Sequence, residues 1–165
     1  MEPKNELKLP TSLVGRVDVA RMLRELGGLN DFFVAAKARQ AGTPIQPPGV
    51  TRVLSALAET NHINLLEEGS RRELAARLEV LRKQAPQLHI SFAVEPSPKA
   101  LEQLVTWFRS SIHPHTLLQV GLQPGIALGC TLRTPNKFFD MSLRAYLEKQ
   151  EQYLVELIKG AVNGR

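Results

Sequence analysis

The spacing of the apolar residues changes at Ala85-Pro86, and this change limits the folds that are open to the chain. Before that point, apolar residues recur every three or four positions, which is the spacing of one helical face. After it, residues 88–94 place apolar side chains at every second position, as in a half-buried strand. Proline also disfavours a helical conformation at the residue before it. We therefore expect a helical domain over residues 1–86 and an α/β domain over residues 87–165.

The first helical segment covers residues 16–40. Asp18 is its expected cap, and Gly27-Gly28 is expected to divide it into two helices. Only 5% of the residues are aromatic, so the core of this half should be mainly aliphatic. A core of this kind favours helices packed on helices.

Two further helical segments follow a Pro- and Gly-rich loop over residues 41–49. One begins near Val50. The other is expected to begin at Ser70 and to end near Lys83, with a stripe of leucines at i, i+4 and i+7: Leu74, Leu78 and Leu81.

The second half predicts elements in the order β-α-β-β-β-α. Ser97-Pro98 combines a capping residue with proline at the first helical position, and residues 116–122 again have the pattern of a strand. A hairpin and a long helix from Ser142 to about residue 160 complete this half. The predicted fold class is α+β, with a small N-terminal helical bundle followed by a two-layer α/β unit.

The hairpin is predicted from residues 126–142. Apolar residues alternate from 126 to 132, a turn follows at residues 134–137, and Phe138 and Phe139 restart the strand. Asp140 or Ser142 should then supply an oxygen that caps the final helix. Cys130 lies on the apolar side of its strand, so we expect a buried thiol.

We assign no residue a catalytic, cofactor-binding or metal-binding role. His113 and His115 are two positions apart, but zinc sites need three or four ligands and no acidic or cysteine cluster accompanies this pair. The chain contains neither a Gly-x-Ser-x-Gly motif nor a phosphate-binding loop. Cys130 is the only cysteine, so the chain forms no internal disulfide, which fits a reducing cytoplasm. We therefore expect a protein that is not an enzyme and needs no cofactor.

The basic composition leaves a nucleic-acid-binding module as an alternative. The net charge is +5 and the pI is about 9.7, values that permit contact with RNA. However, the basic residues are scattered, and the strands show no interleaved surface aromatics of the RNA-recognition type. His89 lies in the opposite phase from Leu88 and Ile90 and should face solvent or a covering helix. Nucleic acid is therefore the less favoured partner.

The end of the chain resembles the delta subunit of F-type ATP synthases, called the oligomycin-sensitivity-conferring protein in mitochondria. Those chains carry glycines in a hairpin strand, then a short strand, an Asp-x-Ser turn and a final helix. The residues that carry the resemblance are Gly125, Gly129, Asp140, Ser142, Leu143, Arg144 and Leu147. In this comparison the chain is similar to a divergent, shortened delta-like member.

The resemblance implies a non-catalytic connector of a rotary motor. Its helical half would bind the N-terminal helices of the alpha subunits, and its α/β half would hold the C-terminal helices of the b subunits in the peripheral stalk. Such a connector binds no nucleotide directly. A V-type peripheral-stalk subunit and the basic RNA-binding module remain the alternatives.

Amphipathic stripes supply the candidate partner contacts. The N-terminal region has no apolar core of a signal peptide, and no apolar run approaches the roughly 18 to 20 residues that span a bilayer. We therefore expect a cytoplasmic protein that meets the cytoplasmic face of the cell membrane only through its partners. The candidate contact residues are Val19, Met22, Leu23 and Leu26 in the first half, and Leu154 and Leu157 in the final helix.

Overall fold

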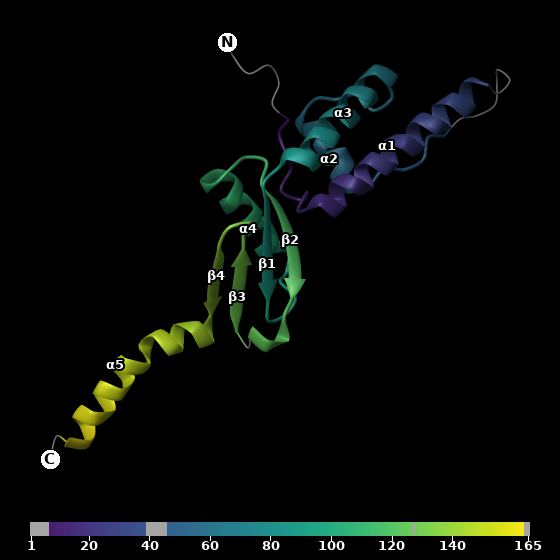
Figure 1. The fold of residues 1–165 in the computed structure, drawn as a ribbon. Helices are drawn as coiled ribbons and strands as arrows, with labels where there is room; N and C mark the ends of the chain where they lie inside the picture. Colours follow the sequence, from purple (N-terminus) through teal and green to yellow (C-terminus); the bar gives the residue numbers. More distant parts are fainter. Residues whose placement is uncertain (1–6, 39–45, 127, 164–165) are drawn as a thin grey trace, which may run out of the picture. The chain divides into compact units, whose positions relative to one another are not determined.

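The computed structural model describes residues 7–38, 46–126 and 128–163. These residues form a mixed α/β fold in which N-terminal helices precede a sheet (Figure 1). Contacts divide the chain into a helical unit and a sheet unit. The helical unit contains the chain up to Pro86 together with Leu101–Leu117, and the sheet unit contains Gln87–Ala100 together with the chain from Leu118 onward. The domain boundary that we expected after residue 86 stays a prediction.

The helical unit is built from α1 (Arg16–Lys37), α2 (Arg52–Thr60) and α3 (Glu68–Gln84), with most of α4 (Pro98–Ser111). Its core is aliphatic, as the low aromatic content predicted. The leucine stripe predicted for the third helical segment is buried in this core. The core residues are Leu7, Leu13, Val19, Met22, Leu26, Leu54, Leu57, Leu74, Leu78, Leu81, Ala85 and Leu117.

The predicted break at Gly27-Gly28 is wrong, because α1 runs continuously through both glycines. The two glycines are exposed, while Leu26 and Leu29 on either side of them are buried. Glycine costs a helix about 1 kcal/mol relative to alanine. The buried apolar stripe on both sides of the glycines offsets this cost, since tertiary packing supplies most helical stability in proteins.

The predicted starts of two helices also need correction. Gly15, not Asp18, is the N-cap of α1, and the Asp18 carboxylate accepts hydrogen bonds from the backbone N–H groups of Gly15 at 3.0 Å and Val14 at 3.1 Å. The third helix begins at Glu68 rather than Ser70, whose hydroxyl donates to the Glu67 carboxylate at 2.9 Å. In both cases the polar side chain lies in the first turn and binds back to the residues before the helix.

Arg71 is a buried cation that joins α3 to the rest of the helical unit. Its side chain is 2% exposed. Its Nε donates to Asn30 Oδ1 at 2.6 Å, its Nη1 donates to the Leu65 carbonyl at 2.8 Å, and its guanidinium lies 4.5 Å from the Phe33 ring centroid. Planar guanidinium geometry allows one side chain to satisfy these partners together.

Arg109, in α4, forms hydrogen bonds with the backbone of the segment that precedes α1. Its guanidinium donates to the carbonyl oxygens of Pro10 at 2.8 Å and Leu13 at 2.5 Å, and Nε donates to that of Thr116 at 3.3 Å. Burial lowers the pKa of Arg109 to about 10, so the group stays charged at neutral pH. The segment is further held where Asn61 exchanges hydrogen bonds with the backbone of Lys8 at 2.9 and 2.8 Å.

The described part of the sheet unit contains a sheet in the order β2-β1-β3-β4. β3 lies antiparallel to both β1 and β4, and the arrows of β1 and β2 point the same way, so the sheet is mixed (Figure 1). With α4 and α5, the element order is the predicted β-α-β-β-β-α. The strands are β1 (Gln87–Phe92), β2 (Leu117–Leu122), β3 (Gly129–Arg133) and β4 (Phe138–Ser142), and α5 is Leu143–Asn163.

Two predicted strands differ in their bounds. β1 ends at Phe92, so Val94 lies beyond it and is exposed. The hairpin strand starts at Gly129 rather than Ile126, because Pro124–Ile126 forms the 3-10 turn η1, closed by a hydrogen bond from the Ile126 N–H to the Gln123 carbonyl at 3.0 Å. Alternation in sequence did not distinguish this turn from the strand that follows it.

Gly129 allows the two hairpin strands to approach closely, as its position in the predicted hairpin suggested. It pairs with Ser142 and has a φ of +95°. A Cβ at this position would lie 2.5 Å from the Met141 carbonyl oxygen. Both the backbone conformation and the space therefore require glycine.

We predict that Gly129→Ala destabilises the sheet unit by about 1–3 kcal/mol, because alanine adds both positive-φ strain and the backbone clash. Gly125→Ala is the matched control, since a Cβ there meets nothing within 4 Å. We expect its effect to stay within about 0.5 kcal/mol. Urea unfolding followed by circular dichroism measures both, and equal effects would contradict the role assigned to Gly129.

A second prediction concerns Arg71→Lys, which keeps the charge but removes the planar donor fork. We expect a loss of about 1–3 kcal/mol, because the ammonium leaves a partly buried acceptor of Asn30 or Leu65 unsatisfied. Arg72→Lys, on an exposed neighbour, should change the free energy of unfolding by less than about 0.5 kcal/mol. Similar losses in the free energy of unfolding of the two variants would show that the guanidinium of Arg71 is not needed for stability.

Candidate partner-binding surface

One face of the sheet is apolar, and its side chains are buried or partly buried on β1 but exposed on the edge strand β4. The register places Ile90 opposite Leu132, which lies opposite Phe139, and the next row contains Phe92, Cys130 and Met141. Ile90 is only 1% exposed, whereas Phe139 is 45% and Met141 51% exposed. The apolar face therefore continues onto β4, where it is open to solvent.

The Asp-x-Ser turn carries the chain from β4 directly into α5. Ser142 Oγ accepts a hydrogen bond from the Ala145 N–H at 3.2 Å, which is the geometry of a helix cap. Asp140 Oδ1 accepts from the Ser142 N–H at 2.9 Å and so holds the turn itself. The prediction that one of these two residues caps the helix is confirmed, and that residue is Ser142.

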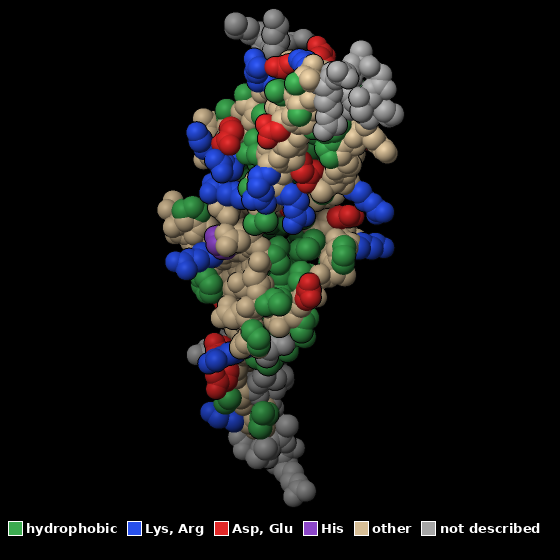
Figure 2. All heavy atoms as spheres, turned by 90° about the vertical axis from the view of Figure 1, so that its right-hand side faces the viewer, with side chains coloured by type: hydrophobic (Ala, Val, Ile, Leu, Met, Phe, Trp, Pro, Cys, Tyr) green, Lys and Arg blue, Asp and Glu red, His purple; other side chains and the backbone are tan. Residues whose placement is uncertain are grey.

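The first turns of α5 expose large apolar side chains. Leu143, Tyr146 and Leu147 recur at helical spacing and are all exposed, although amphipathic helices normally bury such a stripe. The start of α5 contacts β4. We call Phe139, Met141, Leu143 and Leu147 together the β4–α5 surface. Figure 2 shows that hydrophobic side chains also reach the surface at the level of the sheet, and that others lie among charged residues along α5.

Two charged side chains in the first turns of α5, Arg144 and Glu148, are paired with each other. Arg144 Nε lies 2.8 Å from Glu148 Oε1, one helical turn away, and this hydrogen bond raises the pKa of Arg144. A pair at this spacing neutralises much of its own charge. The first turns of α5 therefore combine an exposed apolar stripe with an ion pair between Arg144 and Glu148. A partner helix with an apolar stripe of its own could pack on this surface.

Three of the four candidate contacts proposed for the first half are buried, and the fourth is partly buried. Val19, Met22 and Leu26 are buried in the core of the helical unit, and Leu23 packs against that core. The assignment of Val19, Met22 and Leu26 as partner contacts therefore needs correction, because these residues pack α1 on its own unit, while the assignment of Leu23 stays a prediction. Leu154 and Leu157 belong to α5, but their side chains lie outside the described residues.

The sequence did not single out Phe139 and Met141 as surface residues. Both lie on the apolar phase of a strand, which in a central strand would mean burial. Only the sheet order, with β4 at the edge, shows that they are open.

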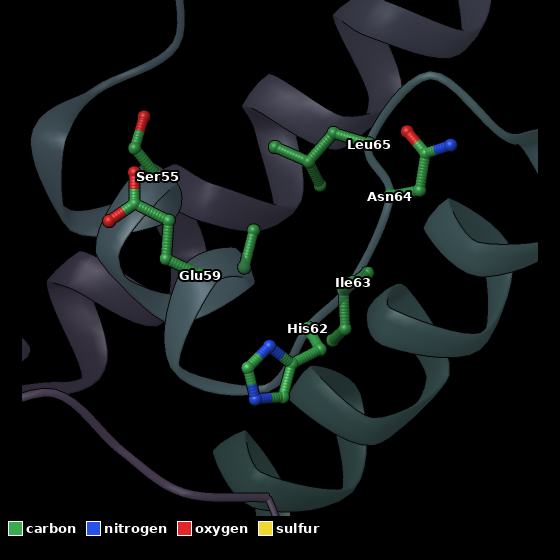
Figure 3. A pocket seen from close by; sticks show the side chains of 7 residues that line it. Ser55, Glu59, His62, Ile63, Asn64 and Leu65 are labelled. Carbon is green, nitrogen blue, oxygen red and sulfur yellow. The ribbon is translucent and has the colours of Figure 1, made fainter.

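The side chains of Ser55, Glu59 and His62 are among those that line a hollow of about 540 Å³ in the helical unit (Figure 3). Figure 3 shows the Ser55 hydroxyl beside the Glu59 carboxylate, while the His62 ring lies apart from both. His62 follows Asn61, the C-cap of α2, and has a φ of +53°, with its N–H bonded to the Glu59 carbonyl at 3.2 Å. These side chains are therefore not arranged as a nucleophile and its base.

The predicted histidine pair is held by backbone groups. The His113 and His115 rings lie 5.7 Å apart, His113 Nδ1 accepts the His115 backbone N–H at 3.1 Å, and His115 Nε2 lies 3.1 Å from the Leu7 carbonyl. Within residues 7–38, 46–126 and 128–163, no three His, Cys, Asp or Glu side chains come together as a metal site would require.

No protein-family model matches the chain, and no curated protein matches it.

In the part of the chain that the structure describes, we find no helix with the length and apolar character needed to cross a membrane.

Cys130 lies half-buried on the apolar face, and burial raises the pKa of its thiol. A raised pKa lowers the thiolate fraction at pH 8, so we predict that iodoacetamide alkylates the folded chain several-fold more slowly than the urea-unfolded chain. The midpoint of the pH–rate profile should also lie higher in the folded chain. Mass spectrometry of timed samples measures both, and equal rates would contradict the burial of this thiol.

Proposed function

We propose that this protein is a non-catalytic connector that binds a helical partner through the β4–α5 surface. The observation that carries the proposal is the exposed apolar stripe at the start of α5, continuous in sequence with an edge strand that also exposes apolar side chains. Contiguous exposed apolar surface is unusual on a monomer and marks interaction sites. A helix with its own apolar stripe would cover such a surface.

We further propose that the assembly is a rotary ATP synthase and that the connector is of the delta type. This proposal rests on the resemblance in the hairpin and the Asp-x-Ser turn. Gly129 permits the close hairpin, Asp140 holds the turn and Ser142 caps α5, so these resembling residues have roles that a shared hairpin would need. The partner helix would then be the C-terminal helix of a b subunit.

The helical unit would bind the catalytic head through outward side chains of α1. Val17 is 70% and Val34 65% exposed, in contrast to the buried residues of the same helix. In this proposal the N-terminal helices of the alpha subunits meet the exposed side of α1. The protein would resist rotor torque mechanically, and ATP synthesis would stay with the alpha and beta subunits.

The test is the double variant Leu143→Asp/Leu147→Asp, because each buried leucine contributes about 1.5–3 kcal/mol to an interface. We expect it to lower partner recovery at least about tenfold in a pull-down from gently solubilised membranes of the native host, with partners identified by mass spectrometry. The wild-type chain should recover the alpha, beta and b subunits together.

Val155→Asp is the matched control, because it places the same charge on α5 at a position that 100° per residue sets about 120° from Leu143. Circular dichroism establishes that all variants remain folded. Unchanged recovery by the double variant would exclude the β4–α5 surface as the contact, and recovery of unrelated proteins by the wild-type chain would exclude the ATP synthase assignment.

A further inference from the structure

A row of three exposed side chains crosses the polar face of the sheet. The register places His89 of β1 opposite Arg133 of β3, and Arg133 opposite Phe138 of β4. All three are exposed, and Phe138 is 63% exposed. Directly opposed residues on one face have Cβ atoms about 4.5–5.5 Å apart, so the side chains of His89 and Phe138 start on either side of Arg133.

A hollow adjoins this row on the same face. It has a volume of about 320 Å³ and is lined by Gln87, His89, Arg133, Thr134 and Pro135. Gln87 Nε2 donates to Gln119 Oε1 at 2.8 Å, which places a pair of amides beside the row. Each amide keeps further hydrogen-bonding capacity, because one bond uses only one donor and one acceptor.

Arg133 supplies the fixed positive charge of the row. Among the described ion pairs, none includes Arg133 or His89. The acidic residue on this face of the hairpin is Asp140, which lies in the next row opposite Thr131 and accepts from the Ser142 N–H. Lys137 closes the turn beside Arg133, with its carbonyl bonded to the Thr134 N–H at 2.8 Å. The local field therefore favours an anion at Arg133.

We propose that this row binds a nucleotide unit, with the phosphate at Arg133 and the base stacked on Phe138. Guanidinium groups bind phosphate through paired charge-assisted hydrogen bonds, and exposed aromatic rings on a sheet stack unpaired bases. An apolar partner would leave Arg133 without its counter-charge, and an inorganic anion alone would leave Phe138 uncovered. A nucleotide unit, either free or within a single strand of RNA, satisfies both residues.

This site is independent of the proposed connector function. Phe138 and Phe139 point to opposite faces of β4, so the nucleotide row and the β4–α5 surface do not share side chains. Phe138 is an exposed aromatic side chain on a strand, although the sequence showed no interleaved surface aromatics of the RNA-recognition type. The sequence predicted only that Phe138 and Phe139 restart a strand, and the register shows that Phe138 lies opposite Arg133.

The experiment measures binding of a fluorescein-labelled oligouridylate by anisotropy at about 50 mM salt, where phosphate contacts are strong. Unlabelled UMP is the competitor. We expect Phe138→Ala and Arg133→Gln each to weaken oligouridylate binding by about tenfold. Competition by UMP at a similar concentration of nucleotide units would identify a free nucleotide as the ligand, and much weaker competition would identify a single strand. Both of these results support the site.

Two matched variants make the test specific. Phe139→Ala removes the same ring from the opposite face of β4, and Arg72→Gln removes the same charge from an exposed position of α3. Both should leave oligouridylate binding within about twofold of wild type. Equal weakening by Phe138→Ala and Phe139→Ala, or by Arg133→Gln and Arg72→Gln, would overturn the proposal. Absence of binding by the folded wild-type chain would overturn it as well, without affecting the pull-down result.

Discussion

Gly129 lies so close to the Met141 carbonyl oxygen that the observed register of the β3–β4 hairpin requires glycine at this position. A slip of one residue would move every side chain of β4 to the other face of the sheet. With the observed register, Phe139 and Met141 continue the apolar face, while Phe138 joins Arg133 and His89 on the polar face. The cap at Ser142 then starts α5 at a fixed point after β4. Both proposed surfaces therefore depend on a contact that only glycine permits.

Local patterns in the sequence were sufficient where the structure depends on neighbours in the chain. The leucine stripe of α3 and the caps at Ser97 and Ser142 involve residues three or four positions apart, and the structure contains all of them. The predicted break in α1 was wrong because its outcome depends on packing. Leu26 and Leu29 are buried against other parts of the helical unit, and that burial outweighs the low helix propensity of two glycines.

The candidate surface was less predictable than the fold, because the spacing of apolar residues in the sequence does not show whether their side chains are exposed to solvent. Val19, Met22 and Leu26 have the same helical periodicity as Leu143 and Leu147, yet the first three are buried and the last two are exposed. The sequence shows that each set forms a stripe, but not whether the chain itself covers it. The sequence also does not show which strand lies at the edge of the sheet. Phe139 and Ile90 are on the same face, but they differ in exposure because β1 is an inner strand and β4 is an edge strand.

The two faces of β4 raise the question of whether their ligands would influence each other. A ligand changes the affinity for another only when the protein has two states that both ligands distinguish. The hairpin offers no obvious second register, because any slip would place a residue with a Cβ where Gly129 now meets the Met141 carbonyl. Binding on one face would then leave the backbone of the other unchanged. A strand fixed in this way can carry a mechanical contact on one side and a nucleotide unit on the other, with additive free energies of binding.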